Sequence, residues 1–308
     1  MIRKTGSLPE VFVYHLDKPA AQDIFHRLIV DFWQHLDADR IERVIVKINL
    51  CEYRRPESGA VTDPDFLASL IRALKTQGTN LPIYIAEVDA TSIDADSAFR
   101  YMSIDRVAAD TGSNLLNLSK TSWHTVTLGQ GLVFKEMYVP DILDSGTLYV
   151  NFSKLKINSG SKITGCLKNN YALIRDKNKA KYHHVVHEAI HDINLALAQT
   201  DMQTMNIIEG YIGMETIGGP AFGKPIKSEL VIASTDPVAV DACEARVIGF
   251  SPHSVRHIAL CSRSGLGCSD YLLRTDIPDF NYNNYRFRFQ RLEYWLRQIV
   301  KNRVGMGI

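Results

Sequence analysis

The chain has 308 residues, of which 45% are hydrophobic and 22% charged, a composition typical of a folded globular protein with a sizeable core. Its 35 Lys and Arg residues balance 34 Asp and Glu residues. This balance excludes the basic footprint that nucleic acid or an anionic membrane would require, so neither partner is expected.

Short apolar runs alternate with segments of helical periodicity in the first third of the chain. Residues 11–16 (VFVYHL) predict a strand, and residues 20–36 carry apolar side chains at helical spacing. RVIVKINL, residues 43–50, predicts a buried strand. A helix then begins at Asp63, where Pro64 suits the first helical position, and residues 81–88 predict the next strand.

The same alternation continues to the C-terminus and predicts an α/β fold, with a mainly parallel sheet flanked by helices. We expect one composite domain over residues 1–308, with a division into two closely packed lobes near 119–124 as an alternative. The last segment predicts an amphipathic helix that would serve a homodimer interface or intramolecular packing. The expected elements are strands at 114–118, 126–128, 146–152, 205–211 and 228–234, and helices at 182–198, from Asp236 onward and at 284–302.

The five cysteines contain no C-x-x-C pair, so we expect neither a zinc ribbon nor an iron–sulfur cluster of standard spacing. The N-terminal sequence lacks the apolar stretch of a signal peptide, and no window approaches eighteen uncharged apolar residues. We therefore expect a cytoplasmic protein with reduced thiols.

Two predicted strands end in charged side chains at the sheet edge where α/β proteins bind ligands. In VIVKINL, Lys47 and Asn49 share one face, whereas Val46 and Ile48 take the other. A lysine inside an apolar strand is costly unless it is paired, used or able to reach water from an edge strand. Glu87 follows the next strand, where it would pair with Lys47 or bind a divalent metal.

The densest candidate is the segment from 151 to 177, which interleaves lysines with Gly, Ser, Thr and Asn. Backbone N–H groups near glycines, together with ammonium groups, suit a phosphate or a carboxylate. The segment is no Walker A loop, and a solvated surface loop is the plain alternative. The residues singled out here are Lys154, Lys156, Asn158, Thr164, Gly165, Lys168 and Asn169.

Two further carboxylates complete the candidate set. Glu209 ends a predicted strand, and the glycine-rich stretch that follows it to Pro225 predicts a long irregular loop. Asp236 is well explained as a helix N-cap. Asp241, inside an apolar helical run, needs a partner such as a lysine or a metal ion.

These segments, taken in order, resemble the family known as domain of unknown function 362. The resemblance runs from about Arg43 to Gly267 and rests on VIVKINL with G-x-x-T-x-P, IAE, SKLK, TGCLKN, HH at His183 and His184, IIEG, GGPAFGKP and ASTDPVAVDA. The family often has a His where this chain has Asn158, and an Asp where it has Glu209. Members are frequently joined to iron–sulfur modules, of which this sequence gives no sign. The resemblance implies a fold and a residue set, but no substrate.

HEAIH, from His187 to His191, matches the H-E-x-x-H pattern of zinc proteases. Around the predicted helix, however, His187, Glu188 and His191 lie away from the centre of the apolar stripe, as on a surface helix. Glu209 and Glu215 are at plausible distances for a third ligand, but they fall in a predicted strand end and a glycine-rich loop; metal binding of another kind by His183, His184, His187 or His191 is an alternative. The pattern therefore disfavours zinc proteolysis, and His183 and His184 match the family resemblance better.

The leading hypothesis is an enzyme that binds an anionic small molecule, carrying a carboxylate or phosphate, at a Lys/Asn-rich site, with Mg²⁺ as a candidate cofactor and transfer or ligation as the preferred reaction. A cofactor-free isomerase or cyclase in a specialised biosynthetic pathway is one alternative, and a non-catalytic small-molecule-binding or redox-accessory protein is another. We assign catalytic roles to Lys47, Glu87, Lys156, Lys168, Glu209 and Asp241, and substrate binding to Asn49, Lys154, Asn158, Thr164, Gly165, Asn169, His183 and His184.

Overall fold

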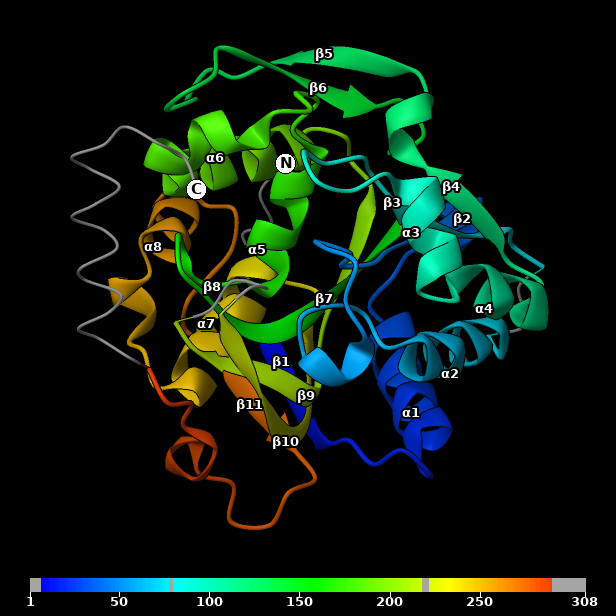
Figure 1. The fold of residues 1–308 in the computed structure, drawn as a ribbon, viewed down its shortest axis with the longest axis vertical. Coiled ribbons are helices and arrows are strands. Elements are labelled where there is room, and N and C mark those ends of the chain that lie inside the picture. Colours follow the sequence, from blue (N-terminus) through cyan, green and yellow to red (C-terminus); the bar gives the residue numbers. More distant parts are fainter. Residues whose placement is uncertain (1–6, 78–79, 218–221, 290–308) are drawn as a thin grey trace.

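The computed structural model describes residues 7–77, 80–217 and 222–289 (Figure 1). Within them, helices pack on both faces of one large sheet, which confirms the predicted α/β fold. The strands of this sheet are β1 (Glu10–His15), β2 (Arg43–Lys47), β3 (Ile83–Glu87), β4 (Asn114–Asn117), β7 (Thr147–Asn158), β8 (Lys162–Ile163), β9 (Gln203–Thr216), β10 (Gly223–Ser234) and β11 (Leu272–Thr275).

The strand order across the sheet is β11-β1-β10-β9-β7-β2-β3-β4, and β8 pairs with β7 beside this path. Strands β9, β7, β2, β3 and β4 run parallel, whereas β10 is antiparallel to both β9 and β1. The sheet is thus mainly parallel, as predicted. Because β7 pairs with β2, residues on either side of the proposed boundary at 119–124 share one sheet; the division into lobes stays a prediction.

The helices form two layers. In Figure 1, α1, α2, α3 and α4 lie on one side of the sheet, and α5 to α8 lie on the other. Asp63 and Asp236 cap two of them, since each carboxylate accepts a backbone N–H of the first turn, as their sequence positions predicted. The helices are α1 (Ala21–Trp33), α2 (Pro64–Lys75), α3 (Ala95–Tyr101), α4 (Ile104–Thr111), α5 (Gly165–Asn169), α6 (Val186–Leu197), α7 (Pro237–Ile248) and α8 (Arg256–Arg263).

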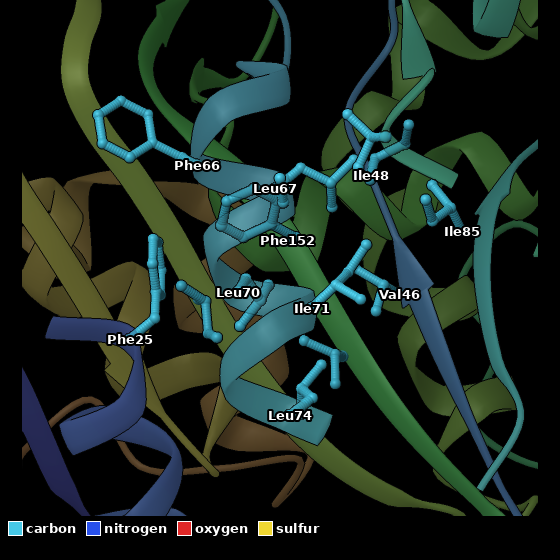
Figure 2. Close-up of a cluster of buried hydrophobic side chains, with 14 of the residues drawn as sticks. Phe25, Val46, Ile48, Phe66, Leu67, Leu70, Ile71, Leu74, Ile85 and Phe152 are labelled. Atoms are coloured by element: carbon cyan, nitrogen blue, oxygen red, sulfur yellow. The ribbon is translucent and has the colours of Figure 1, made fainter. Parts of the chain in front are cut away.

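Successive side chains of β2 point alternately to the two hydrophobic cores, one on each face of the sheet. Val46 and Ile48 pack against α2, where Leu70 and Ile71 are fully buried (Figure 2). Ile45 points to the opposite core, as expected for a strand covered on both faces. Truncating Leu70 to alanine would cost about 2–5 kcal/mol of stability through the cavity it leaves.

The glycine-rich stretch after Glu209 is strand at both of its ends, and its residues 218–221 lie outside those described. Strand β9 continues to Thr216 and pairs with β10 from Gly223 onward, which corrects the sequence prediction. Gly213 allows close packing in this pair of strands, since a Cβ there would lie 2.7 Å from the Leu155 carbonyl oxygen. Sequence patterns treat such glycines as loop formers because they do not show the neighbouring strand.

Two other predictions differ in detail. The weak strand at 126–128 belongs to β5 (Trp123–Thr127), which forms a separate hairpin with β6 (Glu136–Pro140) at the top of Figure 1. The predicted helix at 284–302 begins as a short 3-10 turn, Tyr282–Tyr285, and residues 286–289 are not helical. Its remaining residues lie outside those described. None of the helices in the described ranges is both long and apolar enough to cross a membrane.

Candidate functional site

Lys47 and Glu87 form a buried ion pair at the carboxyl ends of β2 and β3. The ammonium nitrogen lies 2.6 Å from a carboxylate oxygen, and both side chains are almost inaccessible to water. The Lys47 ammonium also donates to the Ile48 carbonyl, and Glu87 accepts the backbone N–H groups of Leu50 and Val88. A buried pair is sustained only when such extra hydrogen bonds satisfy both partners. The sequence predicted this pairing as one alternative to a divalent metal at Glu87.

Lys154 and Glu209 form a second buried pair two strands away. They stand directly opposite each other on β7 and β9, and the Lys154 ammonium donates to the Glu209 carboxylate. Burial raises the pKa of Glu209, although the neighbouring Lys154 charge opposes the shift. Lys154, predicted to bind substrate, is therefore engaged inside the protein, as is Glu209, which was assigned a catalytic role.

Lys156 begins a chain of buried amides. Its ammonium nitrogen lies 2.7 Å from the Asn49 side-chain oxygen and 2.6 Å from the Ala60 carbonyl oxygen. Asn49 donates to Asn169 at 2.8 Å, which brings together two residues predicted to share a site. The chain of hydrogen bonds continues through Asn151 and Asn170 to Asn194. Because each of these side chains has a hydrogen-bond partner, the network holds β7, α5 and α6 rigidly together.

Asp241 is held by a helix N-terminus. Its two carboxylate oxygens accept the backbone N–H groups of Cys166 and Leu167, at 2.6 and 3.0 Å, in the first turn of α5. Burial raises the pKa of Asp241 to about 8, against the effect of these two bonds. The partner expected for Asp241 was a lysine or a metal ion; the structure supplies backbone amides instead.

Gly165 and Thr164 lie at the same junction. Gly165 has φ +58°, and a Cβ there would approach the Asp241 carboxylate to 2.4 Å, so glycine is required at this position. The Thr164 hydroxyl is buried, with no hydrogen-bond partner among the described residues. One Glu244 carboxylate oxygen is likewise buried and unpartnered, whereas the other accepts the backbone N–H of Lys156.

The other predicted residues are dispersed. The Asn158 side-chain oxygen accepts the backbone N–H groups of Gly160 and Ser161 and so closes the β7–β8 turn. The Lys168 ammonium lies 5.9 Å from the Tyr171 ring centroid, on which His183 also packs. His184 is exposed. Lys156 contacts Asn49 and Ala60, whereas Lys168 lies over the Tyr171 ring; that the two lysines hold one anion together stays a prediction.

The two histidines of HEAIH also have different neighbours. The His187 ring stacks on His257, with 3.0 Å between the Nδ1 atoms. His191 is buried and contacts Asp192 and Ser264, so its expected place on a surface face is wrong. In the described part of the chain, no group of three His, Cys, Asp or Glu side chains has the arrangement of a metal site.

Sequence reasoning missed a pair of adjoining clefts near the ends of β3 and β4, which we call the basic cleft. The inner part encloses about 120 Å³ and is lined by Val88, Ser119, Trp123, Ala172, Ile174, Arg175 and Lys179. The outer part, about 400 Å³, shares Ile174 and Arg175 and adds Phe134, Glu136, Met137, Tyr138, Asp176 and Tyr182.

Lys179 is the buried cation of the basic cleft. Its ammonium nitrogen donates to the Asp89 carbonyl oxygen at 2.8 Å. Burial lowers the pKa of Lys179 to about 8, and the nearby Lys47 charge acts in the same direction while Glu87 opposes it. A signal for this residue was present: basic residues continue beyond Lys177, the point at which the lysine-rich segment was ended.

Comparison with known protein families decides where this chain belongs. The family model described as "Domain of unknown function (DUF362)" matches residues 44–246, well over half of the chain. The chain is a member of the DUF362 family. The matched range contains both buried ion pairs, the asparagine network and Lys179. No curated protein and no solved structure matches the chain.

Proposed function

We propose that this DUF362 protein is an enzyme acting on an anionic small molecule, carrying a carboxylate or phosphate, in the basic cleft. One observation carries the proposal: Arg175 stands where the two parts of the cleft meet, with Lys179 deeper inside. The cleft lies beside the carboxyl ends of parallel strands, the usual ligand-binding edge of an α/β sheet.

Arg175 and the aromatic side chains of the outer part suit an anion with an apolar body; of the two carboxylates beside them, Glu136 and Asp176, the second is paired with Lys181. Phe134, Tyr138 and Tyr182 provide aromatic surface in the outer part, and the Arg175 guanidinium carbon lies 4.8 Å from the Tyr138 ring centroid. An arginine in this setting offers a planar fork of donors for a carboxylate or a phosphate. We infer that the anionic end of the ligand meets Arg175 while its apolar part contacts the aromatic rings.

The environment of Lys179 favours proton transfer. With its pKa near 8, a fraction of this amine is neutral at neutral pH and available as a general base. This observation favours the isomerase or cyclase alternative over transfer or ligation. Glu87, Glu209 and Asp241, the expected Mg²⁺ ligands, are engaged with Lys47, Lys154 and backbone amides, so the proposal assigns them no metal.

In this proposal the buried lysines and asparagines are positioning residues. Lys47 and Glu87 lie close enough to Lys179 to act on its pKa, and the asparagine network fixes the segment from α5 onward. We also propose a cytoplasmic location and a role in a specialised biosynthetic pathway; the five free cysteines support the first of these.

The test is binding of two probe anions, benzoate and phenyl phosphate, measured by calorimetry, with neutral benzamide as the uncharged comparison. Arg175→Gln and Lys179→Met should each weaken binding of the anions by about tenfold or more, since a charged hydrogen bond contributes roughly 1.5–3 kcal/mol. Lys177→Met, an exposed lysine in the same segment, is the matched control and should bind as the wild type does. Equal anion affinity in all four proteins would contradict the proposal.

A non-catalytic binding protein would give the same calorimetry. The Lys179→Met variant distinguishes the two functions, once a substrate has been found by screening isomerisable anions. In an enzyme, this variant should lower kcat for that substrate in addition to any change in KM. In a binding protein, only affinity changes.

A further inference from the structure

Three residues, two in the middle of α6 and one at the end of α8, form an ordered relay and do not line the basic cleft. The Ser264 hydroxyl oxygen is 2.7 Å from His191 Nε2, and His191 Nδ1 is 2.8 Å from an Asp192 carboxylate oxygen. Ser264 directly follows α8, whereas His191 and Asp192 belong to α6. Two helices that are distant in sequence therefore bring a hydroxyl, an imidazole and a carboxylate into line.

The chemistry of the partners fixes the direction of these hydrogen bonds. Asp192 also accepts the backbone N–H groups of Leu132, Val133 and Phe134, at 2.7 to 3.0 Å. Burial opposes ionisation of Asp192, but the hydrogen bonds outweigh it and lower the pKa of this carboxyl. An ionised carboxylate only accepts, so His191 carries its proton on Nδ1 and presents the Nε2 lone pair to the Ser264 hydroxyl.

Burial decreases along the relay toward Ser264. Asp192 is 0% exposed and His191 1% exposed, whereas Ser264 is half-buried. Ser264 is thus the most exposed residue of the three. A nucleophile beside a base that is itself oriented by a third group is the arrangement that activates serine for acyl transfer.

We propose that Ser264, His191 and Asp192 form an acyl-transfer triad that takes small ester substrates. In the first step the Ser264 oxygen attacks the ester carbonyl carbon and its proton passes to His191 Nε2. The carbon–oxygen bond to the alcohol then breaks, and the alcohol leaves with that proton. Water, deprotonated by His191, hydrolyses the acyl-serine and releases the carboxylic acid, after which the proton returns to Ser264.

This triad is a separate site from the basic cleft, although Asp192 accepts a hydrogen bond from the backbone of Phe134, which lines the cleft. Ser264 lies beyond residues 44–246, the range of the family match, and does not line the cleft. The alternative is that the three residues only fasten α6 to the end of α8. A structural fastening predicts an unreactive serine, whereas an activated one reacts with phosphonyl fluorides, because the P–F bond breaks as the serine oxygen–phosphorus bond forms.

The experiment is labelling of the whole folded chain with a fluorophosphonate probe, followed by mass spectrometry of the labelled peptide. Ser264 should react at least tenfold faster than Ser262, a half-buried serine two residues earlier that serves as the internal control. Ser264→Ala should abolish the modification, and Ser262→Ala should leave its rate unchanged.

The role of the base is tested separately. His191→Gln and Asp192→Asn should each slow labelling of Ser264 by about a hundredfold or more, the usual scale of general base catalysis. Circular dichroism shows which of the two variants is folded, and rates are compared only for folded protein. An unlabelled Ser264 in the folded wild type, or a wild-type labelling rate in either folded variant, would overturn the proposal.

Discussion

Lys47 and Glu87 stand on adjacent parallel strands with 2.6 Å between their charged atoms, and neither side chain reaches water. Removing one partner leaves a buried charge without compensation. We expect Lys47→Met or Glu87→Leu alone to cost about 3–5 kcal/mol in the free energy of unfolding. The double variant Lys47→Met/Glu87→Leu should recover most of that loss. Denaturant unfolding of all four proteins gives the cycle; additive losses would show that the two side chains do not interact.

Gly165→Ala should destabilise the protein more than a Gly→Ala substitution at a position where no other atoms lie nearby. Its positive φ costs about 1–2 kcal/mol for an L-residue, and the methyl group would meet the Asp241 carboxylate at 2.4 Å. Gly129 has nothing within 4 Å, so Gly129→Ala is the matched control and should change stability by about 0.5 kcal/mol or less. Similar melting temperatures for the two variants would refute this account of the α5 junction.

Lys179 gives a pH dependence with a definite sign. Below pH 8 the amine is charged in both the folded and the unfolded chain, and the folded state bears the full cost of burying it. Between about pH 8 and the ordinary value of 10.5, the folded state loses the proton first, so stability relative to Lys179→Met should rise with pH. The slope should approach 1.4 kcal/mol per pH unit inside this window. A difference that stays flat would place the Lys179 pKa near its ordinary value.

Asp192 should hold the backbone of residues 132–134, just before β6, in place. Its carboxylate accepts three backbone N–H groups, from Leu132 to Phe134. Asp192→Asn should speed hydrogen exchange at these amides, because the uncharged oxygen binds them more weakly. The pKa of Asp192 is lowered in the folded state, so its stabilising effect is complete above the ordinary value of 3.8 and fades as the pH falls below it. Unchanged exchange at residues 132–134 would contradict the assignment.

Local patterns in the sequence were sufficient for most of the elements and, as one of two alternatives, for one pair of site residues. Apolar alternation in VIVKINL placed Lys47 on a different face from Val46, and Asp63 and Asp236 marked helix starts through their capping chemistry. These features depend on neighbours within a few positions. The pairing of Lys47 with Glu87 followed because consecutive parallel strands share an edge.

Long-range contacts were beyond such patterns. Lys154 and Lys156 resemble a solvated charge run, yet the strand continues through them and buries both against residues 55 and 107 positions away. Asp241 finds its partners at the N-terminus of α5, 75 positions earlier. The basic run continues through Lys179, but the burial that lowers the pKa of this amine comes from packing between segments, which no local pattern shows.

The central claim is that the basic cleft binds the anion of the substrate, and a crystal structure determined with phenyl phosphate tests it most directly. The account predicts the phosphate within hydrogen-bonding distance of the Arg175 guanidinium, with the phenyl ring among Phe134, Tyr138 and Tyr182, and loss of the bound ligand in Arg175→Gln crystals. Phosphate bound at the Lys154 or Lys156 segment with the basic cleft empty would contradict the claim.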